Sequence, residues 1–195
     1  MPNWVNNTLT VEGSMAQEFA KKAAQTYTLG YKDAKARPET YATPIYFEVN
    51  EKDLSFFNFV KPETEKAMED YITGGWYDWN VYNWGTKWDA LEVSRTDDRN
   101  NPVEVSFIFN TAWSPPVEWL YKVAEQYPDL KFTLEYREES GWGGEMIAYK
   151  GEVVADKSYD VPSSHQEWID QGEECLSCVY EQELYEDCPK EEEVL

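Results

Sequence analysis

The stretch that decides the fold is residues 76–89, WYDWNVYNWGTKWD, which holds four of the nine tryptophans of the chain. A second aromatic run, TAWSPP at residues 111–116, follows shortly after it. Tryptophan and tyrosine bury a large apolar area while keeping one polar group that needs a partner. This density predicts either the packed centre of a small domain or an aromatic recognition surface.

We interpret the aromatic segment as packed core, because large aromatic side chains are mostly buried in folded domains. The alternative is a pocket that recognises a small nucleotide. Stacking on nucleic acid normally pairs aromatic residues with a basic groove, and Lys87 is the only base in residues 76–89. We therefore expect no direct nucleic-acid binding. The candidate ligand-binding residues of the alternative are Trp79, Asn83, Trp84, Thr86, Lys87 and Trp113.

The chain has 195 residues, enough for one domain with an appendage, and its aromatic content rules out a disordered acidic chain. The net charge of −21 is concentrated at one end, since residues 165–195 carry 11 acidic residues against one base, Lys190. A field of this sign repels nucleic acid and anionic membranes and attracts basic protein surfaces.

Several classes of protein are excluded by what the sequence lacks. It has no apolar run of about 18 residues, so we expect no membrane span. The first residues lack the basic and apolar regions of a signal peptide, which predicts a cytoplasmic location. It has no P-loop, HExxH, GxSxG or dinucleotide fingerprint, so we expect no enzymatic activity.

Hydrophobic periodicity predicts an α+β fold, with an antiparallel sheet of ferredoxin-like type and helices packed on one face. The predicted strands are 7–12, 45–49, 54–60, 90–94, 103–110, 131–136 and 145–154, the last with an alternative interruption at Gly151. The predicted helices are 14–27, 62–71 and 114–127.

The C-terminal segment begins with a capping box, Ser164 to Glu167. Apolar residues follow at helical spacing, which predicts an acidic amphipathic helix over residues 165–187. The predicted division is a ferredoxin-like domain at 1–155 and an acidic helical appendage at 156–195.

Four segments carry a family resemblance: MPNWVNNTLTVEG at 1–13, the aromatic segment at 76–89, TAWSPPVEWL with QYPDLKF at 111–132, and LEYREES-GWGGE at 134–145. Together they resemble phage- and plasmid-encoded proteins with a YubB-type ferredoxin-like domain, over residues 1–155. The resemblance implies the ferredoxin-like fold and a mobile-element origin, and it implies no reaction. One departure is Val5, where relatives often have cysteine.

The single histidine and all three cysteines, His165, Cys175, Cys178 and Cys188, lie within 24 residues. A Cys3His set is a legitimate structural zinc site, and Cys-x2-Cys is the usual half-site. Against zinc, a continuous helix would place Cys175 and Cys178 on one apolar face, and spacings of nine residues do not fit a standard finger. We favour the packed helix and keep structural zinc as the alternative.

The sequence therefore predicts a non-enzymatic accessory protein of a mobile element. It would bind and inhibit a host protein with a basic surface, of the nucleic-acid-processing or defence class, through an acidic surface that mimics nucleic acid. The alternative is a sponge that sequesters a signalling nucleotide near Trp84 and Lys87. Sheet edges and the acidic stripe both allow a homodimer. The predicted contact residues are Glu167, Asp170, Glu173, Glu174, Glu181, Glu183, Glu186 and Asp187.

Overall fold

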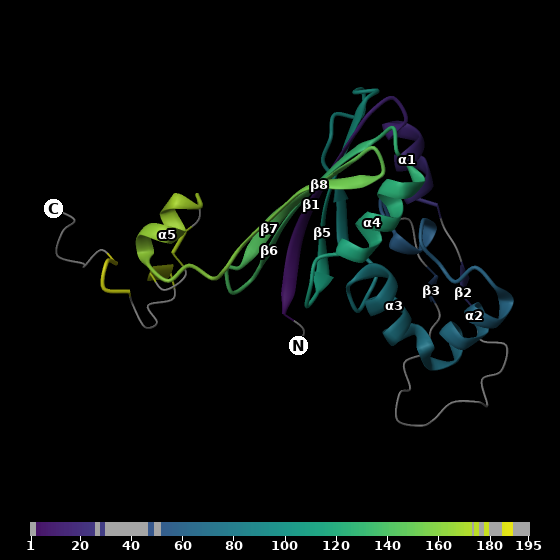
Figure 1. Ribbon diagram of the computed structural model, residues 1–195, viewed down its shortest axis with the longest axis horizontal. Coiled ribbons are helices and arrows are strands. Elements are labelled where there is room, and N and C mark those ends of the chain that lie inside the picture. The colour runs from purple at the N-terminus through teal and green to yellow at the C-terminus, as the bar shows by residue number, and fades with distance from the viewer. Residues whose placement is uncertain are drawn as a thin grey trace.

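The computed structural model describes residues 3–25, 28–29, 47–48, 52–172, 174–175, 178–179 and 185–188. Its centre is an antiparallel six-stranded sheet with the order β4-β5-β1-β6-β7-β8 (Figure 1). The strands are β1 Trp4–Glu12, β4 Leu91–Arg95, β5 Glu104–Ala112, β6 Lys131–Glu138, β7 Gly143–Tyr149 and β8 Glu152–Tyr159. The predicted α+β class with an antiparallel sheet is confirmed.

The helices are α1 Ala16–Ala23, α2 Glu65–Asp70, α3 Trp76–Trp84, α4 Val117–Gln126 and α5 His165–Asp170. Helix α1 connects β1 to the β4–β5 hairpin, and α4 connects β5 to β6, which is the strand and helix order of a ferredoxin-like domain. A short two-stranded ladder pairs β2 Thr28–Leu29 with β3 Phe47–Glu48, within the segment inserted before β4. Helices α1, α3 and α4 lie on the same side of the sheet (Figure 1).

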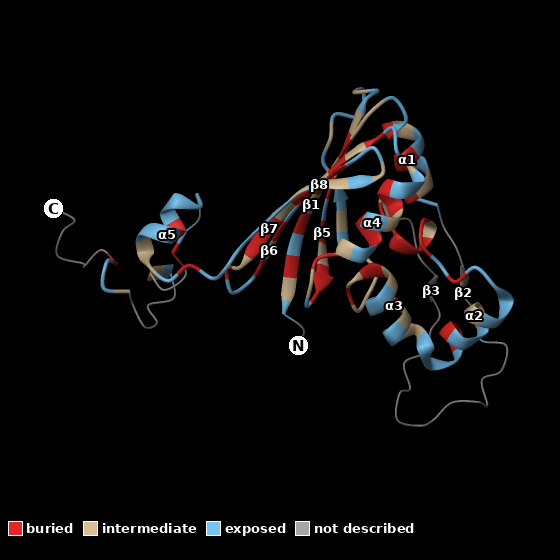
Figure 2. Cartoon of the chain, in the orientation of Figure 1, coloured by how far each residue is buried: buried red, intermediate tan, exposed pale blue. Residues whose placement is uncertain are grey.

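Alternation along each central strand divides the sheet into two unlike faces. Leu9, Phe107 and Leu134 are neighbours across three strands, and they are buried in one cluster with Phe19 of α1 and Trp119 of α4. Figure 2 shows buried residues along the central strands and on the helices beside them. The opposite face is polar, as in the contact of Asn6 with Asn110 across β1 and β5 at 3.3 Å. Among the described helices, α1, α3 and α4 cover only the apolar face of the sheet.

Two predicted strands are corrected. Residues 54–60 form a 3-10 turn, Phe56–Asn58, because the Asp89 carboxylate accepts the Phe56 N–H at 2.6 Å and holds the segment in a turn. The continuous form of the strand predicted over 145–154 is wrong, and its alternative, an interruption at Gly151, is confirmed. The segment forms the β7–β8 hairpin, because Lys150 and Gly151 both have positive φ, as a type I′ turn requires.

Both edge strands are irregular. The β4–β5 pairing shifts register between Leu91 and Ser94, and Glu92 within it has a φ of 52°. The β7–β8 pairing shifts between Ile147 and Ala148. Such bulges twist and bend a strand locally.

The predicted continuous helix over 165–187 is wrong. Helix α5 ends at Asp170, and Gly172 follows with a φ of 76°, the left-handed conformation that commonly ends helices. The described residues from 161 to 188 instead form a small folded unit, here called the C-terminal module, beyond the far ends of β6, β7 and β8 (Figure 1). Strand β8 continues to Tyr159 before the module begins.

Among the described helices, none combines the length and the hydropathy that a bilayer span needs.

Part of the aromatic segment at residues 76–89 lies in the hydrophobic core of the domain. Trp84 is 1% exposed, donates its Nε1–H to the Val60 carbonyl at 2.9 Å, and packs edge-to-face on Phe56 and Trp79. Other residues of the same helix face solvent, since Tyr82 is 78% exposed. The segment is thus core on one side and surface on the other.

We expect Trp84→Ala to lower the free energy of unfolding by about 3–5 kcal/mol, because it leaves a cavity and an unpaired Val60 carbonyl. Tyr82→Ala on the same helix is the matched control and should cost less than about 0.5 kcal/mol. Urea denaturation followed by circular dichroism measures both. Equal losses in the two variants would contradict the assignment of Trp84 to the core.

Candidate functional site

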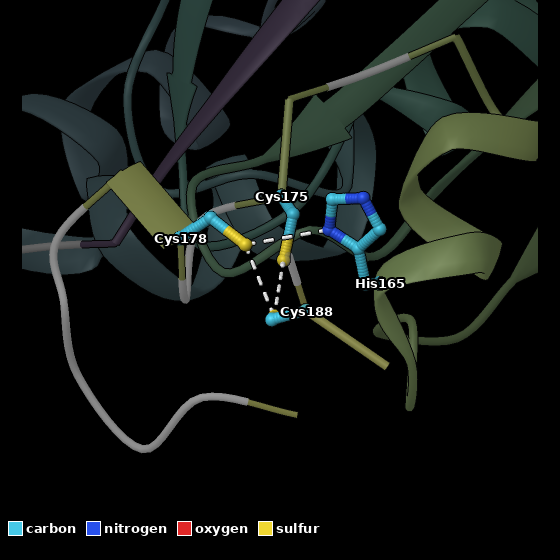
Figure 3. Close-up of side chains that lie close together, drawn as sticks. All are labelled: His165, Cys175, Cys178 and Cys188. Atoms are coloured by element: carbon cyan, nitrogen blue, oxygen red, sulfur yellow. Dashed lines mark hydrogen bonds between the residues drawn. The ribbon is translucent and has the colours of Figure 1, made fainter. Parts of the chain in front are cut away.

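The structure brings together the four residues that could bind a metal. The nearest donor atoms of His165, Cys175, Cys178 and Cys188 all lie within 4.8 Å of one another (Figure 3). The Cys178 and Cys188 sulfurs are 3.0 Å apart, Cys175 and Cys188 are 3.9 Å apart, and Cys178 Sγ is 3.3 Å from His165 Nδ1. One of the two sequence arguments against a metal required a continuous helix, and that helix is absent from the described residues. The other, the spacing of nine residues between ligands, does not prevent the four side chains from converging.

Local hydrogen bonds explain how three separated segments converge. The Ser164 hydroxyl accepts the Glu167 N–H at the start of α5 and fixes the backbone beside His165. The Asp187 carboxylate, from the far end of the module, accepts the backbone N–H groups of His165 and Gln166, both at 2.9 Å. These bonds from Gln166 and His165 lower the pKa of Asp187. The chain next to Cys188 is thereby held against the helix that carries His165.

The turn that carries the Cys-x2-Cys pair is also hydrogen-bonded. The backbone N–H groups of Cys178 and Val179 both donate to the Cys175 carbonyl at 3.0 Å. Burial opposes ionisation of the Cys175 thiol, but the Cys178 backbone N–H and the His165 side chain outweigh it and lower the pKa of Cys175. The Cys188 sulfur, with burial and Cys175, raises the pKa of Cys178 to about 12. The Cys175 and Cys178 thiols therefore differ in how readily they lose a proton, as closely coupled groups do.

The indole of Trp168 packs the module against the sheet. Trp168 is 3% exposed, and its ring packs directly on Gly141, in the turn between β6 and β7. The guanidinium of Arg137 lies 5.1 Å from the Trp168 ring and 5.4 Å from the ring of Tyr159. Sequence reasoning missed this contact, although the glycine-rich run GWGGE indicates a close approach of another group.

Two surface hollows lie on the polar side of the sheet. One of about 370 Å³ is lined by residues of β1, β6, β7 and β8, including Arg137, Glu145 and Lys157. The other, of about 550 Å³, lies where Trp168 and Glu174 of the module meet the end of the sheet. Neither hollow is lined by the residues proposed for the nucleotide pocket.

Those six aromatic-segment candidates are engaged within the fold. Trp84 and Thr86 are buried, and the Thr86 hydroxyl donates to the Ala112 carbonyl at 3.0 Å. Asn83 donates to the Trp79 carbonyl and accepts from Lys122. Lys87 lies 4.5 Å from the Trp113 ring and 4.6 Å from that of Trp88. Trp84 and Thr86 therefore lie in the core, whereas Trp113 is 44% exposed.

Five of the eight predicted acidic contact residues are described, and all five are exposed: Glu167, Asp170, Glu174, Glu186 and Asp187. Glu173, Glu181 and Glu183 lie outside the described residues. Because the predicted helix is not formed, the five do not share a stripe along one helix. They are distributed over α5 and the two short segments that follow it.

Comparison with known proteins identifies the domain. The model of the ferredoxin-like domain in Api92-like proteins matches residues 83–183, from the end of α3 into the C-terminal module. The crystal structure of a protein Api92 from Yersinia pseudotuberculosis is similar, with a TM-score of 0.56 and 10% sequence identity, over 83% of this chain and 99% of that chain. At 10% sequence identity, this similarity supports a shared fold and nothing further. No curated protein matches the sequence.

We expect Gly141→Ala to release the module from the sheet, because a β-carbon at this position would collide with the Trp168 ring. Hydrogen exchange at residues 165–172 should rise roughly tenfold or more, which corresponds to about 1.4 kcal/mol. Gly74→Ala is the matched control, since Gly74 also has positive φ, +135° against +109°, but has nothing within 4 Å of the added carbon. The same exchange at 165–172 in both variants would show that Gly141 does not support the module.

Proposed function

We propose that this chain, which belongs to the family with the ferredoxin-like domain of Api92-like proteins, is a non-enzymatic binding protein whose C-terminal module captures a partner protein with a basic surface. The observation that carries the proposal is the display of five exposed carboxylates on a small folded unit beyond the end of the sheet (Figure 1). A folded unit holds such charges in fixed relative positions, which a frayed acidic tail does not.

The hydrogen bonds of these carboxylates do not neutralise their negative charge, and the carboxylates remain exposed to solvent. Glu167 accepts from the Ser163 backbone and hydroxyl, Asp170 from the Gln166 amide, and Asp187 from two backbone N–H groups. These donors are neutral, so they orient the carboxylates and leave their charge in place. A basic surface that approaches the module would meet an oriented negative field.

The module also offers apolar contact area. Ile169 is 49% exposed and Val179 is 50% exposed, and Ile169 directly precedes Asp170 in α5. Protein interfaces combine an apolar centre with a polar rim, and charge complementarity mainly sets the rate and specificity of association. The expected partner surface is therefore basic, with an apolar patch at its centre.

The partner class follows from charge and from the family setting. A groove that normally binds phosphates is basic and would accept an oriented set of carboxylates, which would block it. Together with the resemblance to phage- and plasmid-encoded proteins, this favours a nucleic-acid-processing or defence protein of the host, encountered in the host cytoplasm. The exposed carboxylates are spread over the module and do not converge on an enclosed site, which suits recognition better than acid–base catalysis.

The test is a charge reversal confined to the module, Asp170→Lys, Glu174→Lys and Glu186→Lys, which spares the capping roles of Glu167 and Asp187. Each change moves the charge by two units, so a variant with Glu18→Lys, Glu63→Lys and Glu125→Lys has the same net charge. We expect wild type and this control to capture the same basic protein from a bacterial lysate, and the module variant to capture at least about tenfold less, a loss of about 1.4 kcal/mol.

Added double-stranded DNA distinguishes mimicry from simple charge attraction. If the module occupies a phosphate-binding groove, DNA should displace the captured protein, and raising the salt concentration should weaken capture. Quantitative mass spectrometry of the bound fractions measures each effect. Capture that is equal in the two lysine variants, or that DNA leaves unchanged, would overturn the proposal.

A further inference from the structure

We propose that His165, Cys175, Cys178 and Cys188 bind one zinc ion, and that this ion closes the C-terminal module. The inference rests on the convergence of the four side chains from three segments of the chain (Figure 3). It does not depend on the proposed partner, and its test needs none.

The spacing of the donor atoms fits a tetrahedral ion. With Zn–S bonds of about 2.3 Å, the sulfurs at two corners of a tetrahedron lie about 3.8 Å apart. The Cys175–Cys188 separation of 3.9 Å matches this edge. The Cys178–His165 separation of 3.3 Å is near the sulfur–nitrogen edge of about 3.6 Å that a Zn–N bond of about 2.1 Å gives. The Cys178–Cys188 separation of 3.0 Å is shorter than a sulfur–sulfur edge, and all four donor atoms lie within 4.8 Å of one another. Small shifts of the side chains would give each donor its bonding distance.

The apolar cluster formed by the described residues of the module is small. Among its described residues, the buried apolar cluster consists of Trp168, Cys175 and Cys188, with Cys178 and Tyr185 packed against it. Three of these five are the proposed sulfur ligands. Units of this size cannot bury enough surface to be stable and commonly depend on a metal or on disulfides. Without a metal, the module would be held mainly by the ligands themselves.

The donor set selects the metal and its role. Three thiolates and one imidazole in tetrahedral arrangement are a structural zinc set, because soft sulfur ligands favour zinc over calcium or magnesium. Four protein ligands fill the tetrahedron and leave no position for a substrate or a reactive water. The ion would therefore stabilise structure and would not perform catalysis, in agreement with a binding role for the chain.

Hydrogen bonds around the site support the same assignment. The backbone N–H groups of Cys178 and Val179 both donate to the Cys175 carbonyl at 3.0 Å and fix the turn that carries two of the ligands. The Asp187 carboxylate fixes the backbone of His165 through its N–H. Groups outside the ligand shell that orient the ligands are typical of built metal sites.

The competing state is a disulfide between Cys178 and Cys188, whose sulfurs are the closest pair. It would use two of the three thiols and give no role to His165. The two states differ in the thiols that remain free, in metal content and in their response to a chelator, so a single set of measurements separates them.

The experiment uses the full chain, purified under reducing and oxidising conditions, with metal content measured by mass spectrometry. We expect one zinc per chain, and the same stoichiometry when zinc or cobalt is returned to chelator-treated protein. Cys175→Ser, Cys178→Ser, Cys188→Ser and His165→Ala should each lower zinc affinity by more than about 100-fold, beyond the effect of changing an outer-shell group. Glu186→Gln, next to the site but not a ligand, is the matched control and should bind zinc as wild type does.

Hydrogen exchange locates the effect of the ion. Chelation should speed exchange at residues 165–188 and leave β1, β5 and β6 unchanged, because the sheet has its own core. The proposal is overturned if wild type binds no more zinc than the four ligand variants, if chelation leaves exchange in the module unchanged, or if freshly purified protein contains a Cys178–Cys188 disulfide in place of the metal.

Discussion

The pairing of β1 along both of its edges is the constraint on which the other elements depend. Val5 to Glu12 pair with β5 on one side and with β6 on the other, so every residue of this run has a neighbour on both sides. Because side chains alternate between faces, this double pairing fixes which residues of three strands point toward the helices. It also positions β6, whose far end, with the turn that follows, carries the Arg137 and Gly141 contacts to Trp168.

Local patterns in the sequence predicted those elements whose stability is local or repetitive. Alternation located the central strands and helical spacing located α1 and α4, since each signal is contained within the element itself. The strand predicted over 54–60 was wrong because the Asp89 carboxylate, more than thirty residues further along the chain, accepts the Phe56 N–H and holds the segment in a turn. The helix predicted for 165–187 was wrong because the left-handed Gly172 ends α5, and the periodic apolar residues after it include the clustered sulfurs.

The candidate site was predictable in composition but not in arrangement. The grouping of His165 with the three cysteines is visible in the sequence, whereas their convergence depends on Asp187 binding the start of α5 from the other end of the module. The predicted acidic contact residues that are described are exposed, and their distribution over a folded unit followed only from the structure. The Trp168–Gly141 contact joins residues that no periodicity connects.

The irregular outer strands bear on how copies of the chain meet. A flat, regular edge strand can pair with the backbone of a neighbouring molecule, and repeated pairing of this kind produces extended aggregates. Here one border is kinked near Glu92 and the other is offset near Ala148, with Asp156 and Lys157 exposed along it. These features disfavour growth through backbone pairing, so a dimer of this protein, where one forms, would have to associate through side chains.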